Sequence, residues 1–311
     1  MKQLLCFLIA VAVLLCGCGS VAGETDARIV FTDDLGREVR LAEEPKRVAC
    51  LLGSFADVWM LAGGEVIAAP DDAWEDFGLA MSEDATVLGS AKSLNLELLL
   101  AAEPDFILAS ANTRQHLGWQ DTLEDTGIPT AYFNVSDFAD YLRLLKLATD
   151  ITGQPDLYEQ YGSAIQTQID DTITRAHQQI DAAGETPTVL YLRLAASGIR
   201  AKNSHDNVLG EMLSSLGCVN IADSDTLLLE NLSMEHILLA DPDYIFLVQQ
   251  GDDTRGTQAA LEAFIADNPG WQSLTAVQEE RVFTLDKRRY SLKPNALWAE
   301  AYSDLAELIW P

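Results

Sequence analysis

The most concentrated set of chemically active side chains is a basic cluster near the C-terminus. Five of the chain's 20 lysines and arginines fall within 13 positions: Arg281, Lys287, Arg288, Arg289 and Lys293. Converging guanidinium and ammonium groups suit an anionic ligand, such as one that carries propionates or other carboxylates. Tyr290 lies among them, and a tyrosine phenolate can ligate ferric iron. The other interpretation is a solvated loop, paired with nearby Asp and Glu, in which Tyr290 packs on the protein.

The histidines and cysteines do not indicate a metal centre or a disulfide scaffold. A zinc site built on one helix needs histidines three to five residues apart, and no two here meet that spacing: His116, His177, His205 and His236. Three of the five cysteines precede residue 19, which leaves Cys50 and Cys218 in the body. We expect both to be buried as small hydrophobic residues, with a disulfide between them left open. There is also no Gly-x-Ser-x-Gly motif, so the residues favour binding over catalysis.

The composition and net charge of the chain limit the classes of partner that it can bind. The chain has 311 residues, 48% of them hydrophobic, which suffices for one large domain or two of ordinary size. Asp and Glu number 48 against 20 Lys and Arg, giving a net charge of −28. A chain this acidic repels the phosphate backbone, so nucleic acid is excluded as a partner. We expect membrane contact only through an anchor, and a monomer.

The N-terminus carries an export signal. Lys2 precedes an apolar run from Leu4 to Leu15, which is shorter than the ~20 residues that a membrane-spanning helix needs. The run ends in Leu15-Cys16-Gly17-Cys18, which resembles a bacterial lipobox. The resemblance implies a signal peptide over residues 1–17, lipid on Cys18 and a tether over residues 18–26. The outer face of a cell membrane is then the expected location. An ordinary signal peptide cut near Ala22 is the alternative.

Two segments 138 positions apart repeat one another. Residues 96–108 read LELLLAAEPDFIL, and residues 234–246 read MEHILLADPDYIF. Each predicts a short helix that ends at a Pro-Asp turn, because proline lacks the N–H that a helix needs. The strand that follows is apolar at consecutive positions, which is typical of a parallel strand buried on both faces. The repeat therefore predicts two α/β lobes of similar design.

Other segments continue the alternation of strands and helices. The first half predicts strands over 47–52, 66–69 and 130–133, with helices over 56–61 and 114–125. The second half predicts strands over 188–192, 219–221 and 281–285, with a helix over 208–216. This order predicts the α/β class, with two Rossmann-like lobes built on parallel sheets.

One long amphipathic helix is predicted between the lobes. From Pro155 to Ala183 apolar residues recur every three or four positions, and Gly184 suits the end of the helix. At 1.5 Å per residue it would span roughly 40 Å, as a stiff spacer. We expect an N-terminal lobe over residues 27–153, the helix over 154–184 and a C-terminal lobe over 185–311. A helix packed inside one lobe is the alternative.

Several segments together resemble the solute-binding proteins of ABC importers, in the branch that carries iron–siderophore complexes, heme and cobalamin. The resemblance rests on the lipobox, on both helix–Pro-Asp–strand units, and on three stretches: residues 31–39 (FTDDLGREV), 45–48 (PKRV) and 292–298 (LKPNALW). It implies two lobes joined by a rigid helix, with a ligand cleft between them. It also implies that Glu97 and Glu235, matched in the repeat, dock into arginine pockets of the permease. Both could instead be solvated helix residues.

Ligands of open parallel sheets bind beyond the carboxyl ends of the strands, so the loops there are the candidate site. Besides Lys287, Arg288, Arg289, Tyr290 and Lys293, the candidate ligand-binding residues are Ser54, Trp74, Ser90, Asn112, Arg193 and Gln249. Trp74 would stack on a flat chelate or macrocycle, although tryptophans in such loops are often core residues. No metal ligand of the protein's own and no cofactor other than the lipid is expected.

The resemblance implies a lipoprotein that captures an iron chelate, either a ferric siderophore or heme, for an ABC permease. The basic cluster favours an anionic chelate over cobalamin. A cobalamin-binding protein of the same branch and a ligand-sensing lipoprotein without a transporter remain the alternatives.

Overall fold

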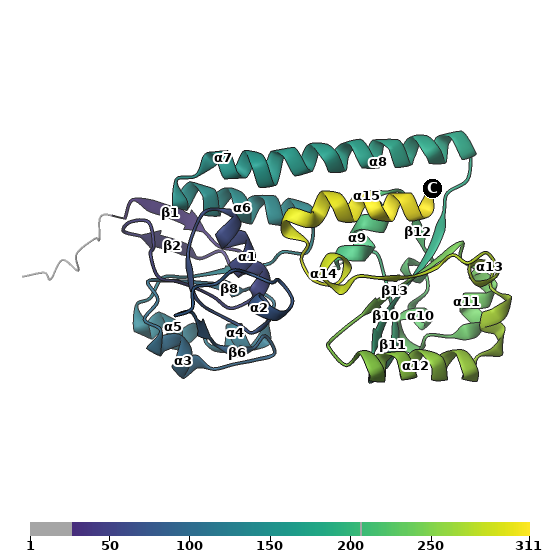
Figure 1. The fold of residues 1–311 in the computed structure, drawn as a ribbon, viewed down its shortest axis with the longest axis horizontal. Coiled ribbons are helices and arrows are strands. Elements are labelled where there is room, and N and C mark those ends of the chain that lie inside the picture. Colours follow the sequence, from purple (N-terminus) through teal and green to yellow (C-terminus); the bar gives the residue numbers. More distant parts are fainter. Residues whose placement is uncertain (1–26, 206) are drawn as a thin grey trace, which may run out of the picture.

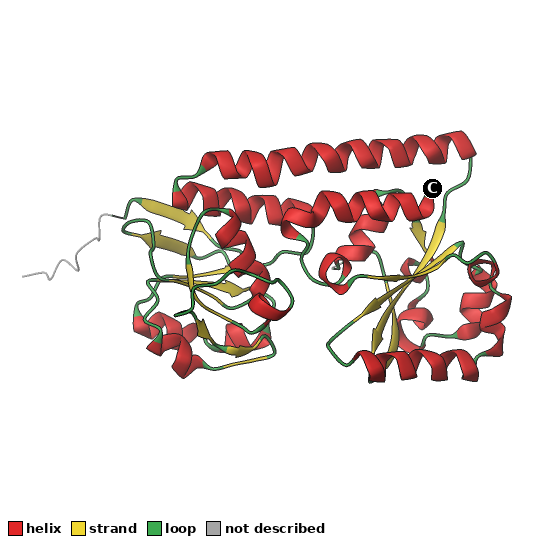
Figure 2. Cartoon of the chain, viewed as in Figure 1, coloured by secondary structure: helices red, strands yellow, loops and turns green. Residues whose placement is uncertain are grey.

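Two α/β lobes lie side by side beneath a layer of long helices (Figure 1, Figure 2). The structure is a computed structural model that describes residues 27–205 and 207–311, so the predicted signal peptide, Cys18 and the tether lie outside it. The architecture confirms the predicted two-lobed α/β class. None of the helices in the described part of the chain combines the length and apolar character needed to cross a membrane.

The N-terminal lobe contains a five-stranded parallel sheet in the order β5-β4-β3-β8-β9. Its strands are β3 (Val48–Cys50), β4 (Val66–Ala69), β5 (Thr86–Val87), β8 (Phe106–Ser110) and β9 (Thr130–Phe133). Two antiparallel hairpins accompany it: β1 (Ile29–Thr32) with β2 (Glu38–Leu41), and β6 (Gly89–Ser90) with β7 (Ser93–Leu94). Val48 and Ala49 enter different apolar clusters, so the sheet is covered on both faces, as unbroken apolar strands predict.

The helices of this lobe are α1 (Gly53–Leu61), α2 (Asp72–Glu75), α3 (Leu96–Ala101), α4 (Arg114–Gly118), α5 (Gln120–Thr126) and α6 (Phe138–Thr152). The single helix predicted over 114–125 is wrong, because the chain breaks at Trp119. His116 is fully buried and accepts the N–H of Ser110 on Nδ1, at 3.0 Å, while the Trp119 ring stacks against it. These contacts fix both residues and end α4 before α5 begins.

The C-terminal lobe has a mixed sheet in the order β11-β10-β13-β14, with β12 also paired to β10. Its strands are β10 (Thr188–Ala195), β11 (Gly198–Lys202), β12 (Val219–Asn220), β13 (Tyr244–Gln249) and β14 (Val282–Leu285). The pairs formed by β10, β12, β13 and β14 are parallel, as predicted, whereas β11, which was not among the predicted strands, runs antiparallel to β10. Gly198 adopts a φ of +133°, which lets the chain reverse without the long crossover of a parallel connection.

The helices of this lobe are α9 (Val208–Ser215), α10 (Thr226–Asn231), α11 (Met234–Ala240), α12 (Thr254–Asp267), α13 (Thr275–Gln278), α14 (Lys287–Tyr290) and α15 (Trp298–Ile309). Short 3-10 turns lie at Ile221–Asp223, Pro269–Ser273 and Asn295–Leu297.

The internal repeat has the same local anatomy in both lobes. Glu103 and Asp241, 138 positions apart, each follow a helix with positive φ, +49° and +39°. Asp105 then accepts the N–H groups of Lys46 and Arg47 ahead of β3, at 2.8 and 2.9 Å. Its counterpart Asp243 accepts the N–H and hydroxyl of Thr188 at the start of β10, at 2.8 and 2.7 Å. Each repeat therefore ties its own strand to the neighbouring one through the same aspartate.

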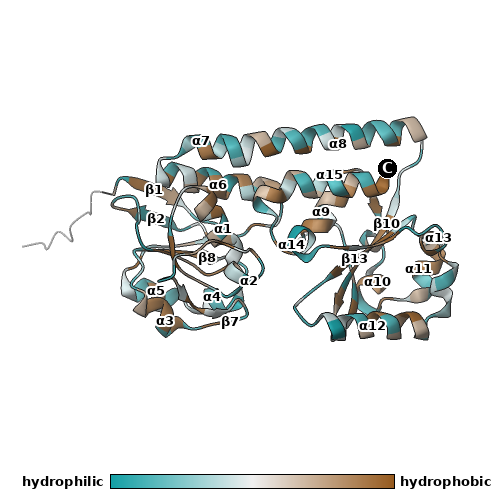
Figure 3. Ribbon diagram, in the orientation of Figure 1, coloured by the Kyte–Doolittle hydropathy of each residue, from teal (hydrophilic) through white to brown (hydrophobic). Residues whose placement is uncertain are grey.

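A continuous helical layer runs above both lobes (Figure 1). It consists of α7 (Pro155–Tyr158), a π-helical turn (Glu159–Ser163) and α8 (Ala164–Ala183), and it ends at Gly184 with a φ of +70°. Many outward-facing turns of α8 are hydrophilic, whereas the strands are hydrophobic (Figure 3). One apolar cluster runs from the first sheet through α6, α8 and α15 to the second. Cys50 and Cys218 belong to it and are buried, as expected, and both are free thiols.

Candidate functional site

A cavity of about 280 Å³ lies where the two lobes face each other. The N-terminal lobe lines it with the loop and helix after β4 and with the β6–β7 turn. The C-terminal lobe contributes Arg193 on β10, the loop after β13, and Lys287 after β14. These positions are at the carboxyl ends of strands, where open α/β sheets bind ligands. A larger hollow of about 540 Å³ around Arg47 is lined by one lobe only, next to the amino ends of β3 and β4.

Carboxylates form the wall of the cavity on the N-terminal lobe. Four of them lie within six positions of the chain: Asp71, Asp72, Glu75 and Asp76. Asp72 accepts the N–H of Gly53, at 3.1 Å, and a side chain at position 53 would come within 2.7 Å of that carboxylate. Burial raises the pKa of Asp72 to about 6, although the Gly53 N–H counteracts it; Asp76 and Asp71 raise it further. Helix α2 therefore presents a carboxylate that is only partly ionised in mildly acidic solution.

Lys287 joins the two lobes across this cavity. Its ammonium donates to both carboxylate oxygens of Asp76, at 2.9 Å, and to Asp252 at 2.7 Å. Burial disfavours the charged form, but the two carboxylates outweigh it, so the pKa of Lys287 is raised. The Lys287 contact lowers the pKa of Asp252. The predicted cation thus lines the cavity, but it is already paired there.

A second contact between the lobes is more deeply buried. Arg288 donates to Asp57 of α1, at 2.9 Å, and its guanidinium lies 4.2 Å from the ring centroid of Phe77. Asn295, which is fully buried, donates to the Asp57 carboxylate and to the Ser54 carbonyl, both at 2.9 Å. Arg288 and Ser54 therefore belong to the junction between the lobes and do not line the cavity.

The rest of the basic cluster points elsewhere. Arg289 pairs with Glu300 and Asp304 of α15, and Arg281 pairs with Glu279. Tyr290 is 3% exposed and donates its hydroxyl to the Ala301 carbonyl at 3.0 Å, so it does not line the cavity and instead packs on the protein, which was the alternative interpretation. The reason is local: residues 287–290 form the turn α14, which spreads consecutive side chains around its axis. Only Lys287 of these four lines the cavity.

Ser90 and Arg193 are the other predicted residues that line the cavity. Arg193 contacts the hydroxyl of Tyr191 at 3.4 Å. Lys293 is partly buried beside them, and burial lowers its pKa to about 8; Asp140 opposes this shift and Arg193 adds to it. These three basic or polar side chains come from different elements, which the chain's order alone does not bring together.

Three further predicted residues are engaged outside the cavity lining. Trp74 packs against the main apolar cluster, which is the core alternative weighed for it. Gln249 folds back onto the Gly251 carbonyl and the Thr254 hydroxyl, at 3.0 and 3.1 Å. Asn112 donates to Asn134 at 2.6 Å.

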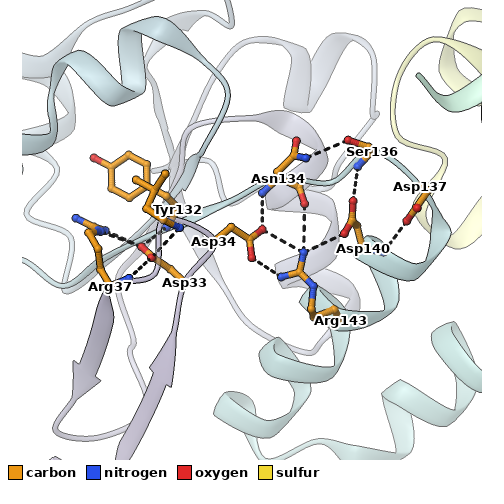
Figure 4. A network of polar contacts seen from close by, with 10 residues as sticks. Asp33, Asp34, Arg37, Tyr132, Asn134, Ser136, Asp137, Asp140 and Arg143 are labelled. Carbon is orange, nitrogen blue, oxygen red and sulfur yellow. Dashed lines mark hydrogen bonds and ion pairs between the residues drawn. The ribbon is translucent and has the colours of Figure 1, made fainter. Parts of the chain in front are cut away.

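Asn134 belongs to a polar network that ties the first hairpin to the lobe (Figure 4). The N–H of Asn134 donates to Asp34, at 2.7 Å, and Arg143 of α6 pairs with the same carboxylate and with Asp140. Asp33 accepts from Arg37, at 2.8 Å, and from the N–H of Tyr132, at 3.1 Å. The polar groups in Figure 4 pair with one another, so we interpret this network as one that stabilises the fold rather than as a binding surface.

Sequence reasoning placed the loops that contain Asp71, Asp72 and Lys92 at strand ends but selected none of these three as a ligand contact. The other charged lining residues that it did not select are Glu75, Asp76 and Asp252. A signal was present, since four carboxylates in six positions follow a predicted strand directly. No cluster of three or more His, Cys, Asp or Glu suited to a metal ion occurs within residues 27–205 and 207–311.

Glu97 and Glu235 occupy equivalent exposed positions in the first turns of α3 and α11. Asn95 caps the first helix and Ser233 the second, by accepting backbone N–H groups. The repeat thus presents one exposed carboxylate on each lobe.

Comparisons with known proteins agree with the two-lobed fold. A family model described as periplasmic binding protein matches residues 48–289. The chain belongs to this family. The vitamin B12-binding protein of Pectobacterium atrosepticum is 25% identical over 218 residues, 69% of this chain and 76% of that protein. An ABC transporter substrate-binding lipoprotein of Bacillus subtilis, YvrC, is 21% identical over 98% of this chain and 95% of its own.

The fold has close counterparts among solved structures. Staphylococcus aureus SirA complexed with staphyloferrin B superimposes with a TM-score of 0.70 at 21% identity, over 90% of this chain and 98% of that one. Membership of the periplasmic binding proteins confirms the prediction of a substrate-binding component of an ABC importer rather than an enzyme.

Proposed function

We propose that this periplasmic binding protein captures an iron chelate, a ferric siderophore or heme, outside the cytoplasm and delivers it to an ABC permease. The observation that carries the proposal is the interlobe cavity, which both lobes line with residues at the carboxyl ends of their strands. Cobalamin is the second candidate, because a vitamin B12-binding protein matches 69% of the chain.

Ligand capture is tested by fluorescence titration of the purified chain, which contains six tryptophans. The panel comprises hemin, ferric hydroxamate and catecholate siderophores, and cyanocobalamin. We expect saturable quenching below about 1 μM, or roughly −8 kcal/mol, by an iron chelate. Saturation by cyanocobalamin alone would replace the first candidate by the second, and no saturation by any member would overturn both.

We propose that Glu97 and Glu235 dock into arginine pockets of the permease, one on each lobe. Their equivalent exposed positions in the repeat support this, since two charge-assisted contacts would fix orientation. The Glu97→Gln/Glu235→Gln double variant should keep ligand binding but lose uptake of the labelled chelate in cells. Unchanged uptake would overturn the docking role, and binding without any uptake by the native protein would favour a ligand-sensing lipoprotein.

We propose lipidation of Cys18 as the anchor, on the strength of the lipobox-like Leu15-Cys16-Gly17-Cys18. Cells fed labelled palmitate should label the native chain and leave Cys18→Ser unlabelled and released from the membrane. Release of the native chain after cleavage near Ala22 would contradict the proposal.

A further inference from the structure

Acidic side chains outnumber basic side chains in the lining of the interlobe cavity. Five carboxylates face it, against three basic side chains: Lys92, Arg193 and Lys287. Within the described residues, Asp71, Asp72 and Glu75 form no ion pair with any of them. The formal balance of the lining is therefore negative, in a chain whose net charge is −28.

Lys287 does not present an unpaired ammonium to an anionic ligand. Lys287, which reaches Asp76 of the other lobe, is already engaged by Asp76 and Asp252. An anionic ligand would have to compete with both carboxylates for that ammonium, while it approached Asp71, Asp72 and Glu75. Because like charges in a narrow, partly desolvated cleft repel strongly, each anionic group on a ligand weakens binding.

The same wall is suited to a cation. The contacts of Lys287 show a primary ammonium held by carboxylates at this wall, at 2.7 to 2.9 Å. Its N-terminal-lobe partner, Asp76, belongs to the acidic segment that also carries Asp71, Asp72 and Glu75. A ligand ammonium would find the same chemistry beside Lys287, at Asp71, Asp72 and Glu75, which no cation of residues 27–205 and 207–311 pairs with.

We propose that the cleft selects a metal chelate that is neutral or carries a positively charged group, and discriminates against anionic chelates. The inference rests on the proposed function and narrows it, since it disfavours heme, with its two propionates, and tris-catecholate siderophores. Asp72 and Glu75 are the residues that set this preference. Of the basic side chains between residues 281 and 293, which suggested an anionic ligand from sequence, only Lys287 lines the cavity, and it is paired with Asp76 and Asp252.

The test is a charge series of chelates bound by the full chain. The probes are ferrioxamine B, a ferric trihydroxamate with a free ammonium; ferrichrome, a neutral trihydroxamate; a ferric tris-catecholate; and hemin. We expect the two trihydroxamates to bind at least about tenfold more tightly than the tris-catecholate and hemin. The affinity for ferrioxamine B should fall as salt rises.

Two charge-neutralising double variants locate the effect. Asp72→Asn/Glu75→Gln should lower the ratio of ferrioxamine B to ferrichrome affinity by about fivefold, and raise the affinity for hemin. Glu83→Gln/Asp84→Asn changes the net charge equally on exposed positions outside the cleft and should leave that ratio unchanged.

A second readout follows from Asp72 itself. Because a nearby cation lowers the pKa of a carboxyl group, ferrioxamine B should release protons on binding at pH 6, measured by calorimetry in buffers of different ionisation enthalpy. Asp72→Asn should abolish that release.

The outcomes separate this inference from the proposed function. Tightest binding by hemin or the tris-catecholate overturns the charge preference and leaves chelate capture standing, as does an unchanged ratio in the cleft variant. Binding by none of the four overturns chelate capture and the charge preference together.

Discussion

The two lobes meet in two regions of opposite character. The hinge side is defined here by Asp57, Arg288, Asn295 and Trp298. Its polar contacts are largely buried, and Trp298 belongs to the apolar cluster that both lobes share. At the mouth, defined by Asp76, Lys287 and Asp252, the lobes are joined by ion pairs, and Asp252 is 84% exposed. Buried packing resists separation strongly, whereas exposed ion pairs contribute little. The difference indicates that the cavity opens at the mouth while the hinge side stays closed.

Among the variants considered, truncation of the largest side chain on the hinge side should cost the most stability. Trp298 is fully buried, with its ring 5.7 Å from that of Phe138 in the other lobe. Trp298→Ala should lower the free energy of unfolding by about 3–5 kcal/mol, because it leaves a cavity in the shared core. Urea denaturation measures this, with the half-buried Trp310→Ala as the control that should cost less. Equal losses in the two variants would contradict the special role of the hinge side.

Arg288→Met tests the polar part of the hinge side. The substitution leaves Asp57 buried with Asn295 as its remaining side-chain donor, so we expect a loss of about 3 kcal/mol. The control is Arg289→Met, whose partners on α15 are about half exposed, and whose loss should stay below about 1 kcal/mol. A loss in Arg288→Met no larger than in Arg289→Met would mean that the Asp57 pair is not a hinge contact.

The comparison also shows what could be predicted from sequence. The two lobes, most strands and the helix from Pro155 to Ala183 follow from apolar periodicity and from the 138-residue repeat, because burial patterns are local. The antiparallel β11 was missed, since its pairing depends on the turn at Gly198. The prediction therefore identified the types of element correctly but did not identify how β11 is connected and paired.

The sequence predicted the region in which the site lies but not most of the residues that line it. Lys287, Ser90 and Arg193 line the cavity as expected from their places at strand ends. Tyr290 does not, because its side chain packs in the core and its hydroxyl donates to the Ala301 carbonyl. Ion pairing between Lys287 and Asp76 joins positions 211 apart, and no local pattern encodes it. The charge clusters in the sequence therefore indicated where the cleft lies but not the sign of the net charge of its lining.

Asp72→Asn sharpens the comparison by removing a charge at the cavity. Burial raises the folded-state pKa of Asp72 from 3.8 to about 6, so its ionisation costs stability progressively as pH rises from 4 to 6. The asparagine oxygen can still accept the Gly53 N–H. We expect the variant to be more stable than the native chain by about 1–2 kcal/mol at pH 7.5 and equal to it at pH 4, from urea midpoints. A pH-independent difference would contradict this account.

The smallest effect on stability, and the most informative for motion, is expected at the mouth. Lys287→Gln removes the ammonium that bridges Asp76 and Asp252, yet these pairs are partly solvated, so the loss should stay below about 1 kcal/mol. The lobes should separate more often, which small-angle scattering would record as a larger radius of gyration in the variant. High salt should enlarge the native chain in the same direction, because it screens the same pairs. Lys146→Gln, which removes an exposed pair with Asp150 within α6, is the matched control and should leave the radius unchanged. If Lys287→Gln instead left the radius unchanged and cost as much stability as Arg288→Met, the mouth would be a second hinge-like contact and the cavity would have to open elsewhere.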